Sequence, residues 1–569
     1  MENWVLLRKG ADFQRIAERF HISPRLACLI RNRGIIGDEQ IEDYLHGTIA
    51  ELQDGMLIKD LNKAVEIIAE KITERKKIRI IGDYDIDGIN ATYILLEGIE
   101  KLNGNVDIDI PHRIKDGYGL NQSLIDTALN EGVDTIITCD NGIAATQEIA
   151  YGKRMGMTII VTDHHEVPYV EEGGQRIYQL PLADAVVDPK REDCEYPFKE
   201  LCGAAVAYKL VEALYNVLAG DAEDIDYLME HVAISTVGDV MNLIGENRIF
   251  VRQGLEMLKR TSNLGIKALM ECTGVSPEQL SVYHIGYILG PCLNASGRLD
   301  TAKRALELLR AETTQEAMKI AWELKELNDS RKELTTEAVE QAIQQVESTE
   351  MKQDKVLVVY MPNCHESLAG IVAGKLRERY YKPTFVLTQG DECVKGSGRS
   401  IDSYHMFEGL NRCKTLLVRY GGHRLAAGLS IQEGDIEEFR RTINEQAGLT
   451  EADMIPKISI DMQLAFSAIT EEFIDELQLL EPFGKGNSKP VFVEKDIEIL
   501  ETRILGKAQN VLKMQLKDGA GTQMEGLYFG DITLFMKTMK GKKMSCTYYP
   551  NVNEYRGRKT IQIVIQNYR

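Results

Sequence analysis

The sequence has no long hydrophobic segment, no closely spaced cysteine pair and no excess of positive charge. No apolar run approaches the roughly 20 residues needed to cross a bilayer. The opening residues, MENWVLLRKGADF, lack the long apolar core of a signal peptide. The ten cysteines are scattered singly, which indicates reduced thiols rather than a disulfide framework. These absences predict a cytoplasmic protein that does not insert into a membrane.

The charge balance is strongly acidic, with a net charge of −20. Such a balance argues against nucleic acid as a partner, because Lys and Arg make most phosphate contacts. Net charge describes the whole surface, however, whereas binding depends on local patches. Bound cations would also neutralise part of the acid, so the composition does not exclude a nucleic-acid substrate.

The first half of the chain is expected to form a helical segment and an α/β domain. At 569 residues the chain is too long for one hydrophobic core. Residues 1–75 are predicted to be helical and to pack on a catalytic domain spanning 76–310. In that domain short apolar runs alternate with helix-length segments, which predicts a mostly parallel sheet. The expected strands lie at 78–82, 106–110, 134–140, 158–163 and 184–188.

The second half is expected to form a linker and two smaller domains. Residues 312–349 contain no Gly or Pro, which predicts one long helix or two, so 311–350 is interpreted as a helical linker. Its charges are most simply solvated. A smaller α/β domain is expected at 351–450. Several short strands then predict an OB-like β-barrel at 451–569 that binds nucleic acid.

Acidic residues and histidines follow three of the predicted parallel strands. In chain order they are Asp83, Asp85, Asp87, Asp140, Asp163, His164 and His165. Because ligands of such sheets bind beyond the carboxyl ends of the strands, we expect these side chains at one edge. Carboxylates and imidazoles without thiolates suit Mn²⁺ or Mg²⁺. Two ions would explain the number of carboxylates and would serve displacement at phosphorus. Taken singly, each Asp could instead form a turn or cap a helix.

Nine ordered segments carry a family resemblance. GDYDIDG, TCDNGI and VTDHHEVP resemble the first three motifs of the DHH phosphoesterase superfamily, and STVGDVMNLIGENR (235–248) resembles the fourth. GPCLNASGRLDTA (290–302) is similar to a segment typical of the RecJ family. HESLAGIVAGKLRERYYKPTFVLT, GSGRS and GGHRLAAG resemble the DHHA1 domain, and EPFGKGNSKPVF resembles the start of the RecJ OB-type domain. The resemblance covers about residues 78–495.

This resemblance implies a 5′-to-3′ exonuclease that degrades single-stranded DNA to nucleoside 5′-monophosphates in DNA repair and recombination. It assigns metal binding to Asp85, Asp87, Asp140, His164 and Asp239. Asp83 and His165 join them as catalytic residues that either coordinate an ion or orient a ligand. In the phosphatase branch a His stands four residues before the D-x-D pair. Ile81 occupies that place here, which argues against a pyrophosphatase.

The resemblance also implies contacts to a 5′-terminal phosphate. The expected residues are Arg113, Arg298, Ser397, Arg399, Gly422 and His423. Fork-shaped guanidinium groups suit a phosphate dianion. The alternative for each Arg is a surface or interlobe salt bridge. The glycine pair at 421–422 could equally mark a strand turn. His365, in CHES, is similar to a motif position of the DHHA1 domain, and a core or capping role is an equal alternative.

Basic groups and tyrosines alternate near the C-terminus. Segments 537–544 and 556–559 flank Tyr548, Tyr549 and Tyr555. This pattern suits an OB surface on which basic groups contact the backbone of a single-stranded nucleic acid and aromatic rings stack on its bases. A solvated hairpin tip with core tyrosines is the alternative.

Two other functions remain open at this stage. A phosphodiesterase of oligoribonucleotides or cyclic dinucleotides would use the same chemistry, but it would need no long binding track. A non-catalytic nucleic-acid-binding relative would be expected to have eroded motifs, whereas the implied ligand set is intact. For the exonuclease we expect a monomer acting on single-stranded DNA with a 5′ end. A helicase and a single-strand-binding protein are the expected protein partners.

Overall fold

The computed structural model describes residues 2–113, 119–218, 222–390, 392–506, 509–539, 541, 543–555 and 557–569. The chain forms two compact units. The larger unit comprises Trp4–Asn294, Ala302–Ala321 and Ser459–Arg569, and the smaller one Met1–Asn3, Ala295–Thr301 and Trp322–Ile458. Within the described ranges no helix combines the length and apolar character that a bilayer crossing requires.

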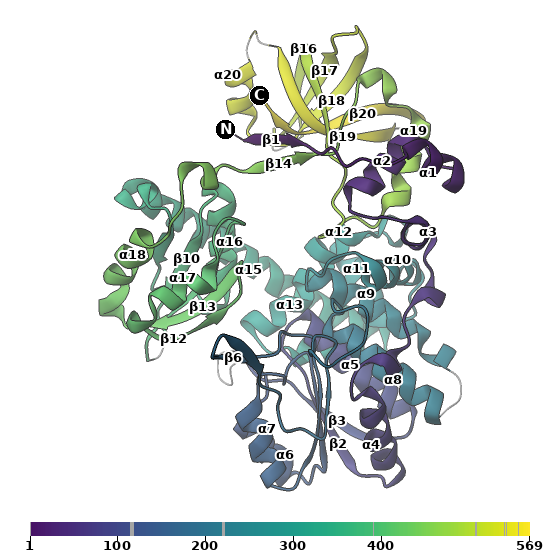
Figure 1. The fold of residues 1–569 in the computed structure, drawn as a ribbon, viewed down its shortest axis with the longest axis vertical. Helices are drawn as coiled ribbons and strands as arrows, with labels where there is room; N and C mark the ends of the chain where they lie inside the picture. The colour runs from purple at the N-terminus through teal and green to yellow at the C-terminus, as the bar shows by residue number, and fades with distance from the viewer. Residues whose placement is uncertain are drawn as a thin grey trace. The chain divides into compact units, whose positions relative to one another are not determined.

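A five-stranded parallel sheet forms the centre of the DHH-like region in the larger unit (Figure 1), as the apolar runs predict. Its strand order is β3-β2-β4-β5-β8, and every neighbouring pair is parallel. The chain adds β3 on one side of β2 and β4 on the other side. The carboxyl ends of β2 and β4 therefore form the topological switch point, the place where ligands bind in such sheets. The strands are β2 (Lys77–Ile81), β3 (Asn105–Asp109), β4 (Thr135–Cys139), β5 (Thr158–Thr162) and β8 (Ala185–Val187).

Helices cover both faces of this sheet, which explains why its central strands are apolar without alternation. One face carries α4 (Leu61–Thr73), α5 (Ile86–Lys101) and α8 (Gly203–Leu218), and the other α6 (Gln122–Asn130) and α7 (Thr146–Arg154). Further helices of the region are α9 (Met229–Gly238), α10 (Gly245–Leu258), α11 (Leu264–Thr273), α12 (Val282–His284), α13 (Gly290–Leu299) and α14 (Lys303–Leu309).

The structure contains a two-stranded hairpin between β5 and β8 that the sequence patterns did not predict. Its strands β6 (Tyr169–Glu172) and β7 (Gln175–Tyr178) are joined by Gly173 and Gly174, which have φ of 60° and 81°. Two glycines with positive φ between short strands are the signature of a tight hairpin turn. The glycine pair is therefore the sequence signal that could have located this hairpin.

The linker and the smaller α/β region also match the prediction. Residues Thr314–Ser348 form a single helix, α15. The smaller unit contains a sheet of order β12-β13-β11-β10-β9, in which only β9 and β10 are parallel. Its elements are β9 (Leu357–Tyr360), α16 (Ala369–Tyr380), β10 (Thr384–Thr388), β11 (Val394–Arg399), α17 (Met406–Arg412), β12 (Leu417–Gly422), β13 (Ala426–Ile431) and α18 (Ile436–Glu445).

The C-terminal region closes into a ring of strands, as expected for an OB-type barrel. Neighbours pair in the order β16-β17-β18-β20-β19, and β19 pairs again with β16. The strands are β16 (Phe492–Leu505), β17 (Val511–Lys517), β18 (Gln523–Tyr528), β19 (Met544–Tyr555) and β20 (Arg558–Tyr568). Tyr548 is fully buried and donates to the Leu464 carbonyl. This tyrosine is therefore a core residue of the barrel, which was the alternative to a base-stacking role. Lys540, Lys542, Arg556 and the Tyr555 side chain lie outside the described residues.

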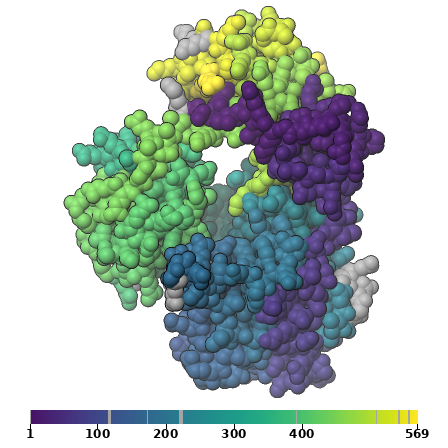
Figure 2. Space-filling model, viewed as in Figure 1, coloured from purple at the N-terminus to yellow at the C-terminus, as the bar shows by residue number. Residues whose placement is uncertain are grey.

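Three N-terminal helices share one hydrophobic core with this barrel. Apolar residues of α1 (Phe13–Phe20), α2 (Pro24–Asn32) and α3 (Asp38–His46) pack in the same cluster as residues from 464 to 565. In Figure 2 the purple N-terminal atoms lie directly against the yellow and green atoms of the barrel. The fourth helix, α4, packs instead beside α8 and β8. The N-terminal segment is thus divided between two cores, and the expected domain boundaries stay a prediction.

Candidate metal centre

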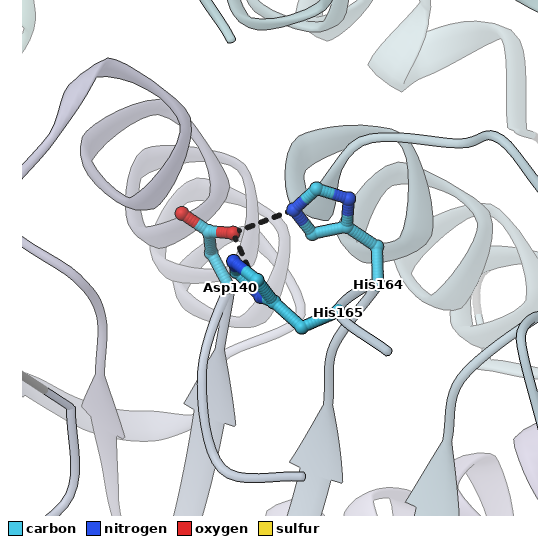
Figure 3. Close-up of side chains that lie close together, drawn as sticks. All are labelled: Asp140, His164 and His165. Carbon is cyan, nitrogen blue, oxygen red and sulfur yellow. Dashed lines mark hydrogen bonds and ion pairs between the residues drawn. The ribbon is translucent and has the colours of Figure 1, made fainter. Parts of the chain in front are cut away.

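The carboxylates and imidazoles converge at the switch point of the parallel sheet. Asp83, Asp85 and Asp87 follow β2, Asp140 follows β4, and His164 and His165 follow β5. Asp239 reaches the same place from the end of α9. Figure 3 shows Asp140 beyond the end of its strand with both imidazoles turned towards it. The structure therefore brings together all seven residues expected at the catalytic site.

A tight turn explains how three aspartates are crowded into DYDIDG. Asp85 caps the N-terminus of α5, and its Oδ1 accepts from the backbone N–H groups of Asp87 (3.0 Å) and Gly88 (3.1 Å). A Cβ on Gly88 would lie 2.5 Å from the Asp83 carbonyl oxygen, so only glycine permits the turn. The cap and the glycine together direct the three side chains to the sheet edge.

The N-terminus of α8 fixes Asp87. Its two carboxylate oxygens accept from the backbone N–H groups of Gly203 (2.7 Å) and Ala204 (2.8 Å). Unpaired N–H groups and the helix dipole favour an anion at this position. A Cβ on Gly203 would lie 2.7 Å from Asp140 Cβ. The glycine therefore lets the helix end approach two carboxylates at once.

Asp140 and Val240 adopt unusual backbone conformations at the centre. Asp140 has φ of 59°, a left-handed conformation that Asp tolerates better than most residues. Val240, directly after Asp239, has φ of 56° although its side chain is β-branched and 59% exposed. Strained backbone of this kind concentrates at functional sites.

His164 lies against three of the carboxylates. Its Nε2 is 3.0 Å from Asp140 Oδ1, 3.5 Å from Asp87 Oδ2 and 3.9 Å from Asp239 Oδ2. Burial and the nearby charge of His165 lower the pKa of His164 to about 3. The imidazole is therefore neutral at physiological pH, the state in which histidine binds metals.

His165 differs from His164 because its imidazole is bound directly by the carboxylate of Asp163. Asp163 Oδ1 accepts from His165 Nδ1 at 2.7 Å, and Asp163 Oδ2 accepts from the Ile143 backbone N–H at 2.9 Å. Although burial opposes the charge, Asp163 raises the pKa of His165 to about 9. Burial likewise opposes ionisation of Asp163, but His165 and the hydrogen bonds hold its pKa at about 2. This pair is an internal ion pair.

Burial and mutual repulsion disfavour the charged forms of the remaining carboxylates. Burial, followed by the charge of Asp85, raises the pKa of Asp87 to about 6. Burial and the charges of Asp87 and Asp85 raise the pKa of Asp239 to about 8. Burial and the charge of Asp85 raise the pKa of Asp83 well above the ordinary range, and burial and the neighbouring carboxylates do the same for Asp140. Nearby positive charge would reverse these shifts.

The donor set suits divalent cations. Three groups of side chains each place ligand atoms within 4.8 Å of one another: Asp140 with His164 and His165, Asp87 with His164 and Asp239, and Asp83 with Asp85 and Asp140. Among the described residues, the buried Oδ1 of Asp83 has no hydrogen-bond partner, which is costly unless something else satisfies it. Hard oxygen donors with imidazole match Mn²⁺ and Mg²⁺. The overlap of the three groups through Asp140 and His164 is compatible with more than one ion.

Three of the predicted phosphate-binding residues surround the first turn of α16 in the smaller unit. Arg298 donates to the Ser367 carbonyl at 3.0 Å. Arg399 Nη1 lies 3.3 Å from Ser397 Oγ. A Cβ on Gly370 would lie 2.9 Å from both Arg399 Nη2 and Ser397 Oγ. The structure thus gathers these three side chains at one helix N-terminus.

The other predicted substrate residues are Gly422 and His423 at a strand turn of the smaller unit, and Arg113 in the larger unit. Gly422 has φ of 140° at the turn between β12 and β13, and His423 donates from its backbone N–H to the Ala426 carbonyl at 2.7 Å. The glycine pair therefore lies at a strand turn, as one of the two interpretations predicts. Arg113, in the larger unit, stacks over the Tyr84 ring at 4.9 Å. His365 caps a short 3₁₀ turn, with its Nδ1 2.7 Å from Ser367 Oγ.

Comparisons with known proteins agree with the domains and the site described above. Family models match at three places: the DHH family N-terminal domain at residues 77–236, the DHHA1 domain at 353–448 and the RecJ OB domain at 460–567. The chain is 35% identical to the single-stranded-DNA-specific exonuclease RecJ of Bacillus subtilis, over 99% of this chain and 70% of that protein. It is 31% identical to the Escherichia coli RecJ, over 100% of this chain and 99% of that one. The chain belongs to the RecJ family.

Solved RecJ structures agree with this assignment. The crystal structure of RecJ with Mn²⁺ from Thermus thermophilus covers all of this chain and 79% of its own, at a TM-score of 0.84 and 26% identity. The corresponding Mg²⁺ complex has a TM-score of 0.80 and 25% identity. The ions in those structures are the two expected from the donor set of this RecJ chain.

Sequence reasoning missed two groups at this centre. Asp188 directly follows β8 and is buried, and burial together with the charge of Asp163 raises its pKa to about 8. The signal was available, since a fourth strand of the sheet also ends at an aspartate. Asn294 was also missed: its Oδ1 accepts from the Ile86 backbone N–H at 2.9 Å and so holds the turn between Asp85 and Asp87.

Proposed function

We propose that this RecJ family member is a metal-dependent exonuclease that degrades single-stranded DNA from the 5′ end and releases nucleoside 5′-monophosphates, in DNA repair and recombination. The observation that supports it most is the convergence of seven carboxylates and imidazoles at the switch point of the sheet. This convergence occurs in a chain that covers nearly the full length of RecJ proteins named as single-stranded-DNA-specific exonucleases.

The proposed ligands of two Mn²⁺ or Mg²⁺ ions are Asp85, Asp87, Asp140, His164 and Asp239. When bound, such ions offset phosphate charge, activate a water and stabilise the leaving oxygen. His164 offers a neutral ring nitrogen because its pKa is lowered to about 3. The α8 N–H groups hold Asp87 in one orientation, so the ligand set is organised before substrate arrives.

Asp83 and His165 complete the proposed catalytic set. Asp163 accepts from His165 Nδ1 and so orients this imidazole. An imidazole oriented in this way beside the carboxylates is suited to contact a phosphate oxygen or to supply a proton to the leaving oxygen. Asp83 provides a buried oxygen whose partner is missing among the described residues.

The proposed 5′-phosphate contacts are Arg298, Ser397 and Arg399, together with Arg113, Gly422 and His423. Two guanidinium groups, a hydroxyl and the N-terminus of α16 are three kinds of donor that favour a phosphate dianion. Their convergence in the smaller unit supports this role for the first three residues. We further propose that a helicase and a single-strand-binding protein expose the substrate, and that the enzyme acts as a cytoplasmic monomer.

The function is tested with long single strands labelled at either end. We expect Mn²⁺- or Mg²⁺-dependent release of labelled mononucleotide from the 5′ end first, little cleavage of blunt duplex and complete loss with a chelator. Degradation of short oligoribonucleotides or cyclic dinucleotides in preference to the long strand would instead favour the phosphodiesterase alternative. Hydrolysis that survives exhaustive chelation would contradict the proposal.

A further inference from the structure

Two exposed tyrosines stack on each other in the larger unit. The rings of Tyr283 and Tyr287 have centroids 5.2 Å apart at an interplanar angle of 26°. Their residues are 60% and 71% exposed. Large aromatic side chains usually gain most of their stabilisation from burial, so a stacked pair facing solvent indicates an interaction surface.

The local helix explains why these rings face outwards. Tyr283 belongs to α12, and Tyr287 lies in the π-helical turn Ile285–Leu289 that follows it (Figure 1). Ile285 and Leu289 of the same turn are buried. The segment is therefore amphipathic, and its outer face carries the tyrosines. Single π-helical turns are rare and frequently mark functional sites.

The inner face of this segment supports the candidate metal centre. A Cβ on Gly286 would lie 3.5 Å from Val237, two residues before Asp239. A Cβ on Gly290 would lie 3.1 Å from Ile86, which stands between Asp85 and Asp87. One continuous segment thus lies against the two helix ends that carry these carboxylates, the C-terminus of α9 and the N-terminus of α5.

A cation lies at the same edge. Leu243 donates its backbone N–H to the Lys485 carbonyl at 2.7 Å, and a Cβ on the preceding Gly484 would lie 3.8 Å from Val282. Lys485 is exposed, and its charge acts to lower the pKa of Asp239. The loop that carries Lys485 therefore passes beside Val282, the residue before Tyr283. Aromatic rings together with a basic side chain are the pair of features that binds single-stranded nucleic acid.

We propose that Tyr283 and Tyr287 form a base-stacking platform for the strand that enters the metal centre, with Lys485 contacting its backbone. The inference rests on the proposed function and adds a specificity determinant to it. Every base has a π face, so such a platform accepts any sequence. Bases inside a duplex are already stacked on their neighbours and cannot occupy it. The platform therefore favours single strands over duplexes.

Kinetics of the double variant Y283A/Y287A test the platform. With a long single strand and Mn²⁺ we expect KM to rise roughly five- to 150-fold, the range that corresponds to loss of one stacked base, while kcat changes little. Y283F/Y287F keeps the rings and should restore KM. Abasic nucleotides placed near the 5′ end should raise KM for the wild type but add nothing for Y283A/Y287A, which a merely structural role would not produce.

A matched control is available on the hairpin. Tyr169 and Tyr178 are another exposed pair, with ring centroids 5.9 Å apart, and Y169A/Y178A should leave KM unchanged. An equal rise in this control would show that exposed tyrosines bind strands non-specifically, and would overturn the assignment. An unchanged KM in Y283A/Y287A would overturn it as well.

Strand binding without cleavage separates this inference from the proposed function. Fluorescence anisotropy with chelator present measures binding of the same strands, and 2-aminopurine near the 5′ end reports stacking through quenching. Weaker binding and lost quenching in Y283A/Y287A, with no such change in Y169A/Y178A, support the platform even if the wild type cuts no strand. Binding and quenching equal to the wild type contradict the platform even if the enzyme is an exonuclease.

Discussion

Asp140 is the residue at which most of the centre's contacts meet. It shares candidate ligand groups with Asp83, Asp85, His164 and His165. Its left-handed backbone and its closeness to Gly203 leave little room for adjustment. Loss of its charge should therefore affect the centre as a whole.

The first prediction is that Asp140→Asn abolishes strand cleavage and leaves strand binding largely intact. Asn tolerates the same backbone conformation but provides no anionic ligand. The loss of kcat should be at least about a thousandfold, since metal-centred charge stabilisation is worth several kcal/mol. Single-turnover cleavage and anisotropy measure the two effects. Asp126→Asn, at a carboxylate that accepts from the Tyr151 hydroxyl, is the matched control and should retain activity.

The second prediction concerns pH. Asp239 has its pKa raised to about 8 by burial and the neighbouring carboxylates, against about 3.9 in the unfolded chain. The folded protein therefore binds the extra proton, and metal-free stability should fall as pH rises from about 4 to about 8. Asp239→Asn should flatten this slope in thermal unfolding with chelator. Mn²⁺ should stabilise the wild type more at pH 8 than at pH 5, and a metal effect independent of pH would contradict the assignment.

At the scale of elements, the N-terminus of α8 organises the centre by donating to Asp87 and contacting Asp140. The third prediction is that Gly203→Ala lowers activity at least about tenfold and weakens metal binding, because the added Cβ would meet Asp140 at 2.7 Å. Isothermal titration with Mn²⁺ and the cleavage rate measure both effects. Gly374→Ala in α16 is the control, since a Cβ there meets nothing within 4 Å. That change should be neutral or stabilise by about 0.5–1 kcal/mol.

The elements show which parts of the molecule are readable from sequence. The five parallel strands were predictable because buried strands are continuous apolar runs, and their ends located Asp83, Asp140 and His164. The anchoring of Asp87 by backbone N–H groups 116 and 117 residues away was not predictable. Any helix start offers such donors, and only the tertiary fold decides which carboxylate meets them. Tyr548 shows the same limit, because an aromatic between charged segments can face either a barrel core or solvent.

At the scale of the whole molecule, the proposed chemistry resides in the larger compact unit, whereas five of the six proposed 5′-phosphate contacts, all except Arg113, reside in the smaller one. The fourth prediction is that Arg399→Ala removes the preference for a 5′-phosphate over a 5′-hydroxyl. The ratio of kcat/KM for the two ends should fall about tenfold or more, as expected when a charge-assisted hydrogen bond is lost. Competition between the two substrates measures the ratio. Arg379→Ala, elsewhere on α16, should leave it unchanged, and an unaltered ratio in Arg399→Ala would place end recognition elsewhere.

The shared core of α1–α3 and the C-terminal barrel bears on how the chain is made. The partners of Leu29, Ile30 and Leu45 lie more than 400 residues later in the sequence. At ribosomal rates of about 5–20 residues per second, those helices wait roughly 20–80 s for their partners to leave the ribosome. During that interval their apolar faces are exposed to other nascent chains. Biogenesis of this protein should therefore depend on chaperones that shield its beginning until its end is synthesised.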